Sequence, residues 1–260
     1  MSHISFSELK IWNECPYKHK LMYTDKLKGF VGNLYTAFGS AIHTACEEYA
    51  KVDFSGNHEA ALVDSYFKEL AELPQEVRDS ISEKDAETFL EQGLQILPEV
   101  PDAVREHFGE FEVVAIEEPL YEPIKEFVEN TYDFKGYIDL VLKTSDGKYH
   151  VIDWKSCSWG WDARRRSDPM ATYQLIFYKH YYALKYGIDP DLIETHFALL
   201  KRTAKVGSKV ELFKVTSGKK RTENALKLLK QALYNINKKR CIKNRTSCNR
   251  CEFYKTEHCT

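Results

Sequence analysis

Several features that would place a protein in a class at once are missing from this sequence. The first twenty residues, MSHISFSELKIWNECPYKHK, have no apolar signal-peptide core, and no apolar run approaches the length of a membrane span. There is also no phosphate-binding G-x-x-x-x-G-K-[ST] run, no internal repeat and no low-complexity segment. The formal net charge is only −2 over 260 residues, so any nucleic-acid surface has to be a local patch. We expect a soluble, cytoplasmic protein with no P-loop motor and no membrane partner.

The order of the predicted elements indicates an α/β fold in a single domain over residues 1–260. Hydrophobic periodicity and capping residues predict helices at about 5–23, 39–51, 170–186 and from Thr222 onward. Apolar runs predict strands at about 111–123, 136–156, 195–202 and 209–217. Residues 58–108 are acidic, helical and interrupted by prolines, so we interpret 54–110 as a helical insertion in an α/β core.

The stretch Gly136–Ser156, GYIDLVLKTSDGKYHVIDWKS, carries charges inside two apolar strands. A Ser-Asp-Gly turn signal between the strands predicts a β-hairpin with Asp139 opposite Asp153, or one residue away from it. Side chains two apart in a strand share a face, so Asp153 and Lys155 point the same way. The other face is expected to be core and carries Ile138, Leu140, Leu142, Ile152 and Trp154.

Charges in so apolar a sheet are costly unless they are paired or bound to a metal ion. Mg²⁺ prefers carboxylate oxygens, and a lysine beside it can orient or deprotonate the attacking water or neutralise charge on a phosphate. Asp139, Asp153 and Lys155 therefore suit metal-assisted phosphodiester hydrolysis. On this pattern alone, a hairpin whose charges are solvated at the surface is as good an explanation as a buried site. The apolar neighbours on both faces favour the buried site.

Two predicted helices add residues that could join this group. His43 and Glu47 are four apart in GSAIHTACE and share one helix face. A neutral His43 could bind a metal ion, or it could be a hydrogen-bonded core residue. Gln174 and Tyr178 share a face in YQLIFYKHYY, where the default role of an aromatic stripe is core packing.

Taken in order, these motifs resemble the RecB-type branch of the PD-(D/E)XK nuclease superfamily. The G-x3-H-x3-E, G-h-h-D, D-h-K and Q-h-x-x-Y motifs of that branch (h, apolar) match Gly39–Glu47, Gly136–Asp139, Asp153–Lys155 and Gln174–Tyr178. The resemblance covers about 5–178 and the C-terminal cysteines, but not the insertion. It implies a restriction-endonuclease-like core, in which a mixed central sheet is flanked by helices.

The resemblance also implies roles for the residues of the hairpin and the first of these helices. His43, Asp139 and Asp153 would bind Mg²⁺ or Mn²⁺, helped by the backbone carbonyl of Trp154. Lys155 would be the catalytic lysine.

For the remaining motif residues, the implied roles are supporting ones. Gln174 and Tyr178 would support the site and the DNA strand, and Glu47 is a candidate for a position behind the metal ligands. The implied activity is that of a metal-dependent deoxyribonuclease, an exonuclease on single-stranded or frayed DNA. Two alternatives stay open: a nuclease of CRISPR spacer acquisition, and a catalytically silent DNA-binding subunit that carries a cluster.

Seven cysteines are present, an odd number that argues against a disulfide framework in a chain without an export signal. Four of them form a C-x6-C-x2-C-x7-C run in a cysteine-rich tail, residues 241–260. This run indicates either zinc or an iron–sulfur cluster. Cys46 and Cys157 have apolar or aromatic neighbours and are expected in the core.

The chain resembles AddB-type and CRISPR-adaptation nucleases, which bind a [4Fe–4S] cluster through one N-terminal and three C-terminal cysteines. SFSELKIWNECPYKHKLMY matches the N-terminal element, which implies that Cys15, Cys248, Cys251 and Cys259 are the ligands and that the tail packs with the N-terminal helix. Seven residues, rather than the usual five, separate Cys251 from Cys259. Cys241 also completes a local set with Cys248, Cys251 and Cys259 that would suit Zn²⁺.

Basic residues gather in three patches, which are Lys18–Lys20 with Lys26 and Lys28, Arg164–Arg166, and 238–250. Charge runs are usually solvated faces, but a groove lined by these patches would bind phosphates without reading bases. Trp159 and Trp161 could stack bases of a single strand or belong to the core. We expect DNA with single strands or free ends as the partner, and a helicase or recombination protein on another chain.

Overall fold

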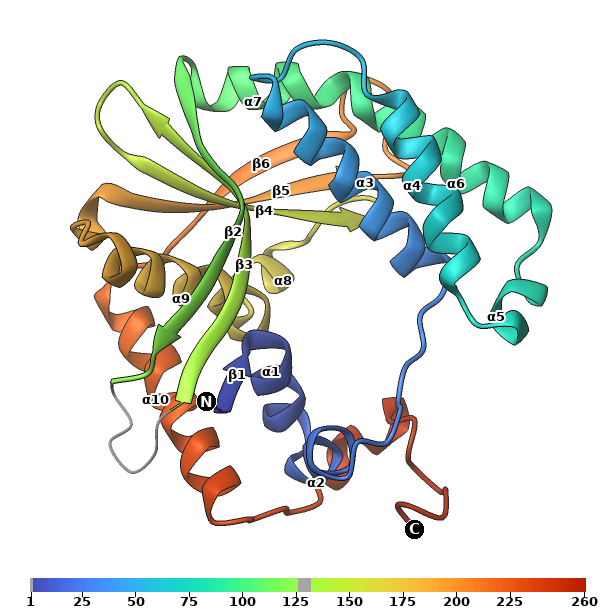
Figure 1. Ribbon diagram of the computed structural model, residues 1–260, viewed down its shortest axis with the longest axis vertical. Helices are drawn as coiled ribbons and strands as arrows, with labels where there is room; N and C mark the ends of the chain where they lie inside the picture. Colours follow the sequence, from blue (N-terminus) through green and yellow to red (C-terminus); the bar gives the residue numbers. More distant parts are fainter. Residues whose placement is uncertain (1, 126–131) are drawn as a thin grey trace.

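One mixed sheet is the centre of the computed structural model, which describes residues 2–125 and 132–260 (Figure 1). Its strands are β1 (Ser2–Ser5), β2 (Phe111–Pro123), β3 (Tyr132–Thr144), β4 (Tyr149–Cys157), β5 (Ile193–Lys201) and β6 (Val210–Val215). The order is β1-β3-β4-β5-β6, and β2 also pairs with β3. The β1–β3 and β4–β5 pairs are parallel, and the other pairs are antiparallel. The α/β fold with a mixed central sheet is therefore confirmed.

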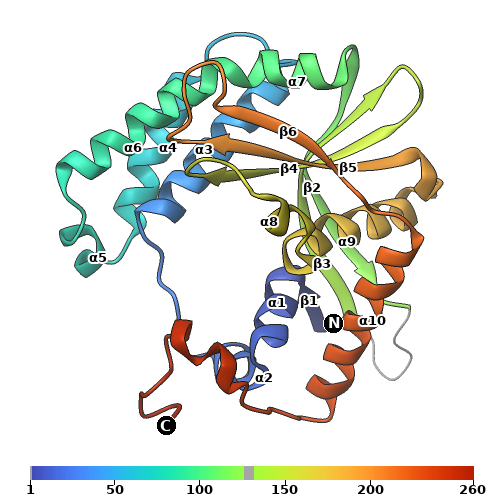
Figure 2. The ribbon, with the colours of Figure 1, turned by 180° about the vertical axis from the view of Figure 1, so that it is seen from behind.

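Helices cover both faces of the sheet, as Figures 1 and 2 show from opposite sides. One layer consists of α3 (Leu34–Lys51), α4 (Glu59–Glu72), α5 (Gln75–Asp79), α6 (Glu83–Ile96) and α7 (Val100–Phe108). The other contains α8 (Ala163–Ser167), α9 (Pro169–Tyr186) and α10 (Lys219–Asn237). An apolar core lies on each side of the sheet between these layers. Over the described residues, no helix has both the length and the apolar character that crossing a membrane requires.

The N-terminal helical region is interrupted, whereas a continuous helix over 5–23 was predicted. The structure has α1 (Phe6–Glu14), α2 (Pro16–His19) and a π-helical turn (Lys20–Thr24). Cys15 between α1 and α2 has extended backbone angles, φ −160° and ψ 111°. The proline that follows it disfavours the helical conformation at Cys15 and so explains the break.

Two other helices begin earlier than predicted. Asn33 caps α3, because its side chain accepts a hydrogen bond from the Thr36 N–H (3.1 Å) and its own N–H donates to Thr36 Oγ1 (2.8 Å). Gly39 therefore lies inside the helix, where a Cβ would come 3.4 Å from Ser156 Oγ of β4. The last long helix, α10, begins at Lys219 rather than at Thr222. Strand β1 and helix α8 were not predicted.

One edge of β3 has a gap in its pairing. On this edge β1 pairs with Tyr132–Lys135 of β3 and β4 pairs with Leu140–Lys143, while β2 follows the opposite edge. The four residues Gly136–Asp139 thus lie between the ends of two neighbouring strands. The G-h-h-D motif occupies this gap, so its side chains can reach a shared space instead of a closed ladder.

The pairing of β2 with β3 is irregular beside this gap. Its register shifts between Val113 and Ala115, and Glu117, which is opposite Asp139, has a left-handed backbone with φ 50°. The face assignment of Ile138 was wrong: Ile138 packs in the core on the α9 side, whereas Leu140 packs on the α3 side. The other residues assigned to that face, which are Leu142, Ile152 and Trp154, lie on the α3 side as expected.

Candidate active site

Asp139 and Asp153 stand at the point where β3 and β4 separate. The last pair of the β3–β4 ladder is Leu140 with Ile152, so the two aspartates are the next positions on their strands, in direct opposition. Asp139 Oδ2 accepts a hydrogen bond of 2.7 Å from the backbone N–H of Trp154. This bond replaces a ladder contact and fixes the Asp139 carboxylate beside β4.

Asp153 is buried without the hydrogen bonds that a buried carboxylate needs. It is only 1% exposed, and neither of its oxygens has a hydrogen-bond partner among the described residues. Lys155 Nζ lies 2.6 Å from Oδ2, an ion pair whose angles are not those of a hydrogen bond. Unsatisfied buried carboxylate oxygens are rare because they are costly, and they indicate a missing ligand.

His43 reaches the same place from α3. Its Nδ1 lies 3.6 Å from Asp139 Oδ2. Burial, and then the positive charge of Lys155, lower the pKa of His43 to about 4. The imidazole is therefore neutral near pH 7 and has a lone pair to offer. The close approach of α3 to β4 at Gly39 is what brings His43 to the carboxylates.

Lys155 is the cation of this group. Burial alone would lower the pKa of Lys155, but the charges of Asp153 and Asp139 outweigh burial and raise it. Lys155 is thus protonated at neutral pH. It can orient a water molecule or neutralise a phosphate oxygen, but it is not a base in this state.

The side chains of α9 close the site from the opposite layer. Gln174 Nε2 donates a hydrogen bond of 2.9 Å to the Tyr178 hydroxyl. The Tyr178 ring lies so close to β3 that a Cβ at Gly136 would come 2.7 Å from its Cε1. Glycine is therefore required there by packing. Burial, and then the charge of Asp153, raise the pKa of Tyr178, which places its hydroxyl near the carboxylates.

Glu117 is a site residue that the sequence analysis missed. It comes from β2 and lies opposite Asp139. Burial, followed by the charges of Asp139 and Asp153, raises the pKa of Glu117. Glu47 of α3 has a raised pKa as well, first from burial and then from the charge of Glu117. A pair of glutamates ending the apolar run VVAI was a signal, but only the strand register reveals which one faces the aspartates.

The donor types at this site suit a divalent metal ion, although the ligand atoms of His43, Asp139 and Asp153 do not all lie within 4.8 Å of one another. Burial raises the pKa of both Asp139 and Asp153 to about 6, which means that their negative charges lack sufficient compensation. A cation between them would supply that compensation. Carboxylate oxygens with one imidazole nitrogen and backbone oxygen suit Mg²⁺ or Mn²⁺.

A hollow of about 560 Å³ leads from Lys155 toward α1. Its lining includes Ser7 and Lys10 of α1, Arg165 of α8 and Gln174 of α9. Positive side chains thus stand on both sides of a passage that ends at the candidate site. Glu14 and Asp168 also line the hollow, so its charge is mixed, with basic residues in the majority. Its position and these basic side chains suit a phosphate backbone.

The aromatic and basic residues near α8 divide into two kinds. Trp161 is 7% exposed and packs on Phe197, with ring centroids 4.8 Å apart, so it belongs to the core. Trp159 is 78% exposed. Arg166 is held by Glu211 at 2.5 Å, whereas Arg165 lies over the Trp161 ring and faces the hollow. Of the Arg164–Arg166 patch, Arg165 is the residue that lines the passage to Lys155.

The structure brings Cys15 to the C-terminal tail. Cys15, Cys248, Cys251 and Cys259 line one cavity of about 260 Å³, and Cys241 is not among its lining residues. The backbone N–H of Asn244 lies 3.3 Å from Cys15 Sγ. No three cysteine sulfurs of the described chain lie within 4.8 Å of one another.

Polar contacts join the two chain ends around this cavity. The Tyr17 hydroxyl donates to the His258 carbonyl at 3.2 Å, and Lys18 forms an ion pair of 2.8 Å with Glu252. Lys18 is also 3.6 Å from Glu14 and is buried, so it does not contribute to a DNA-binding patch. Cys46 lies in the core, as expected, and Cys157 packs beside the other core cluster at intermediate exposure.

Known proteins share this fold and its sequence pattern. The profile of the PD-(D/E)XK nuclease superfamily matches residues 3–256. A solved structure from Eubacterium rectale, provisionally named an exonuclease, superimposes with a TM-score of 0.62 at 12% identity and covers 98% of this chain and 89% of its own. The structure of SSO0001 has a TM-score of 0.40 at 13% identity, covering 95% and 93% of the two chains, which is too low to argue from. No curated protein sequence matches. The match over nearly the whole length shows that the chain belongs to the PD-(D/E)XK nuclease superfamily.

Proposed function

We propose that this protein is a Mg²⁺- or Mn²⁺-dependent deoxyribonuclease, an exonuclease that acts on single-stranded or frayed DNA. The observation that carries the proposal is the state of Asp153. This carboxylate is fully buried, has no hydrogen bond to either oxygen, and stands beside Asp139, His43 and Lys155. Such a costly arrangement is explained if a metal ion and a phosphate complete it.

In this proposal His43, Asp139 and Asp153 hold the ion, together with the backbone carbonyl of Trp154. The bound ion would polarise the scissile phosphate and make a water molecule more acidic. Lys155 stays protonated, orients the attacking water and neutralises charge that develops on the phosphate.

The residues around this centre have positioning roles. Gln174 holds the Tyr178 hydroxyl, and Tyr178 packs against Gly136, so both keep the strand that carries Asp139 in place. Glu117 and Glu47 add negative charge that favours cation binding. The hollow lined by Lys10 and Arg165 accommodates the sugar-phosphate chain.

The preference for single strands or ends rests on two supports. The hollow is bounded by α1 on one side and by α8 and α9 on the other, which suits a flexible single strand better than a rigid duplex. The structural neighbour from Eubacterium rectale is provisionally named an exonuclease. At 12% identity that neighbour supports the fold, and its activity enters here only as part of the proposal.

We further propose that Cys15, Cys248, Cys251 and Cys259 bind an iron–sulfur cluster. Four sulfurs about 2.3 Å from one tetrahedral zinc ion would lie about 3.8 Å from one another. The cysteine sulfurs here are farther apart and surround a cavity of about 260 Å³, which leaves room for a larger group. The absence of Cys241 from the cavity lining weighs against the local zinc set.

A cleavage assay tests the nuclease proposal. End-labelled linear single strands, linear duplex and closed circles are incubated with Mg²⁺ or Mn²⁺, with wild type beside Asp153→Ala and Lys155→Ala. Asp146→Asn, a change of an exposed aspartate in the same hairpin, is the matched control. We expect linear strands to shorten with wild type and with the control, and not with the two site variants.

Other outcomes decide between the alternatives. Cleavage of circles would show an endonuclease and overturn the exonuclease proposal. Binding without cleavage of any substrate would overturn the enzyme proposal in favour of a silent DNA-binding subunit. For the cluster, anaerobically purified protein should be brown, should contain iron and sulfide, and should lose both in Cys15→Ser. A colourless protein with one equivalent of zinc would refute the cluster.

A further inference from the structure

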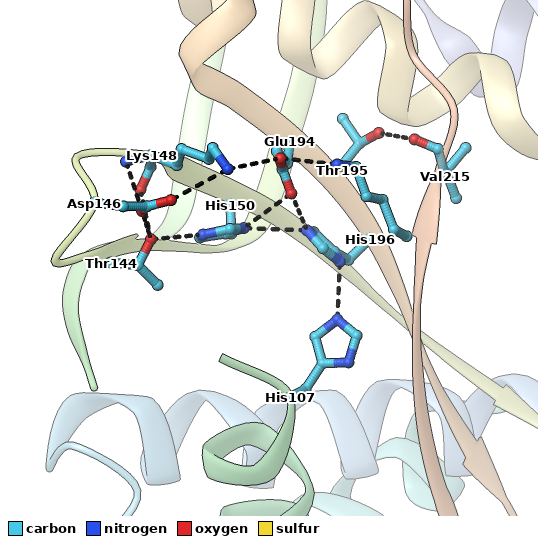
Figure 3. A network of polar contacts seen from close by, with 10 residues as sticks. His107, Thr144, Asp146, Lys148, His150, Glu194, Thr195, His196 and Val215 are labelled. Atoms are coloured by element: carbon cyan, nitrogen blue, oxygen red, sulfur yellow. Dashed lines mark hydrogen bonds and ion pairs between the residues drawn. The ribbon is translucent and has the colours of Figure 1, made fainter. Parts of the chain in front are cut away.

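A second polar cluster lies at the start of β4 and β5. His150 of β4 and His196 of β5 are 6% and 3% exposed, and Glu194 lies two residues before His196. His150 Nδ1 is 3.1 Å from His196 Nε2, and Glu194 Oε2 is 4.0 Å from each of these nitrogens. Figure 3 shows the two imidazoles side by side with Glu194 next to them. Within the described part of the chain, they are the one group of three His, Cys, Asp or Glu residues whose ligand atoms all lie within 4.8 Å of one another.

The cluster is separate from the proposed catalytic centre. β4 pairs with β5 in unbroken register over its whole length, so its side chains alternate strictly between the two faces. His150 is therefore on the opposite face from Asp153, three residues away. It packs under α7, where His150 and His196 contact the Phe108 ring with centroid distances of 4.8 Å and 5.0 Å.

We propose that His150 Nδ1, His196 Nε2 and a carboxylate oxygen of Glu194 form a binding site for one transition-metal ion, with zinc as the natural candidate. A point equidistant from these three atoms lies about 2.2 Å from each of them, which is close to the length of zinc bonds to imidazole nitrogen and carboxylate oxygen. Imidazole ligands favour Zn²⁺, Cu²⁺ or Ni²⁺ over Mg²⁺ and Ca²⁺. A fourth position is left for a water molecule.

Both imidazoles already have the outer partners that metal-binding histidines require. Thr144 Oγ1 donates to Asp146 Oδ1 at 2.5 Å, so it can accept from His150 Nε2 at 2.9 Å. This bond leaves the lone pair of His150 on Nδ1, toward the proposed ion. On the other side His196 Nδ1 is 3.2 Å from His107 Nε2, which can accept its proton. Such outer partners fix the tautomer and orientation of metal-binding imidazoles.

The charges around Glu194 also orient it for this role. Its Oε1 is 2.8 Å from Lys214 Nζ and 3.5 Å from Lys148 Nζ, so the lysines lie at one oxygen and the imidazoles at the other. Lys148 is also paired with Asp146 at 3.1 Å, which balances its charge. Burial lowers the pKa of both His150 and His196, and neutral imidazoles are the metal-binding form.

An ion at this position would connect three parts of the fold. His150 follows the β3–β4 turn, His196 belongs to a central strand, and His107 lies in the last turn of α7, where 54–110 returns to the sheet. Metal binding would therefore stabilise the attachment of the helical segment to the sheet, a structural role that does not depend on cleavage.

Cobalt is the probe for the test, because its visible spectrum distinguishes nitrogen and oxygen ligands from thiolates. The full chain is titrated with Co²⁺ as wild type and in Asp153→Asn, so that binding at the carboxylates is counted separately. An equivalent that Asp153→Asn loses belongs to the carboxylate site, and we expect one equivalent with nitrogen and oxygen ligands to remain in that variant. His196→Gln and Glu194→Gln should remove it, and His107→Ala should weaken it about tenfold. His3→Gln, at an exposed histidine, is the control and should leave it unchanged.

A second measurement needs no variant and covers the case in which a substitution prevents folding. X-ray absorption of the zinc-loaded wild-type chain should show imidazole and carboxylate ligands at about 2.0–2.2 Å, whereas zinc on cysteines would give sulfur at about 2.3 Å. Sulfur ligands alone, the same Co²⁺ binding in His196→Gln as in wild type, or no binding at all would overturn the proposal.

Discussion

The two faces of β4 differ in how completely their buried polar groups are hydrogen-bonded. Asp153, on one face, has two oxygens without hydrogen bonds and a pKa raised by burial to about 6. His150, on the other face, takes part in a hydrogen-bonded row from Thr144 through His196 to His107. The first group is incomplete without a ligand, and the second is complete with or without one. A deficit in buried hydrogen bonds therefore indicates function more strongly than burial or clustering alone.

Neutralising Asp153 is the most direct test of this difference between the two faces. Asp153→Asn should reduce cleavage roughly 10³-fold, because it removes a charge that holds the cation and aligns Lys155. In the absence of metal the same variant should unfold at a higher temperature than wild type, since the two buried aspartates carry one negative charge more than Lys155 balances, and Asp139 stays as the counter-charge of Lys155. Cleavage rates and thermal melts in a chelator measure both effects. If the variant loses both activity and stability, the missing hydrogen bonds of Asp153 do not indicate a functional site.

The raised pKa values of the two aspartates should also make the stability of the metal-free protein depend on pH. Asp139 and Asp153 have pKa values of about 6 when folded, against about 3.8 for an ordinary aspartate. The folded state thus binds protons more tightly than the unfolded state, so their contribution to stability is lost as pH rises from about 4 to 6. The expected loss is on the order of 3 kcal/mol for each aspartate. Urea unfolding at several pH values measures it, and Asp139→Asn with Asp153→Asn should flatten the curve. An unfolding free energy that does not change between about pH 4 and 6 would refute the raised pKa values of Asp139 and Asp153.

Packing behind the carboxylates should matter to a smaller extent. Gly136→Ala places a Cβ 2.7 Å from the Tyr178 ring, so either the ring or β3 has to move. We expect a cost of about 1–3 kcal/mol in unfolding free energy and a clear fall in cleavage. Gly147→Ala is a control at a turn position with open space but a positive φ of 82°, so it should lower stability without affecting cleavage in the folded protein. Equal specific activity of Gly136→Ala and wild type would show that the Tyr178 contact is not required.

The smallest effect is expected on the histidine face. Thr144→Val removes the acceptor of the His150 Nε2 proton and leaves a buried N–H without a partner. The cost should be about 1–2 kcal/mol in unfolding free energy. Cleavage by the folded enzyme should be unchanged, because the carboxylates lie on the other face. A fall in cleavage as large as that of Gly136→Ala would mean that the two faces are coupled.

The sequence predicted those parts of the site that are local in the chain. His43 with Glu47, Asp153 with Lys155, and Gln174 with Tyr178 each share a face because of the period of one helix or one strand. The structure brings His43 to Asp139, Lys155 to Asp153 and Gln174 to Tyr178. The turn signal limited the hairpin to two registers, and the structure has the one in which Asp139 is opposite Asp153.

Features that depend on contacts between distant segments could not be found in this way. Glu117 becomes opposite Asp139 only through the pairing and irregularity of β2 and β3. Lys18, which was assigned to a basic patch, is buried because Glu252, more than two hundred residues away in the chain, pairs with it. The row of His107, His150 and His196 likewise comes from three elements whose spacing in sequence shows no pattern.

The gap in β3 at Gly136–Asp139 has a consequence for how this protein avoids association. An unpaired strand segment is usually a site where a second chain can add a strand and begin aggregation. Here β1 and β4 bound the segment at both ends, four residues apart, so no strand of another copy has room to pair along it. The protein can thus leave the backbone of β3 unpaired beside the carboxylates in the middle of its sheet while presenting no open edge there.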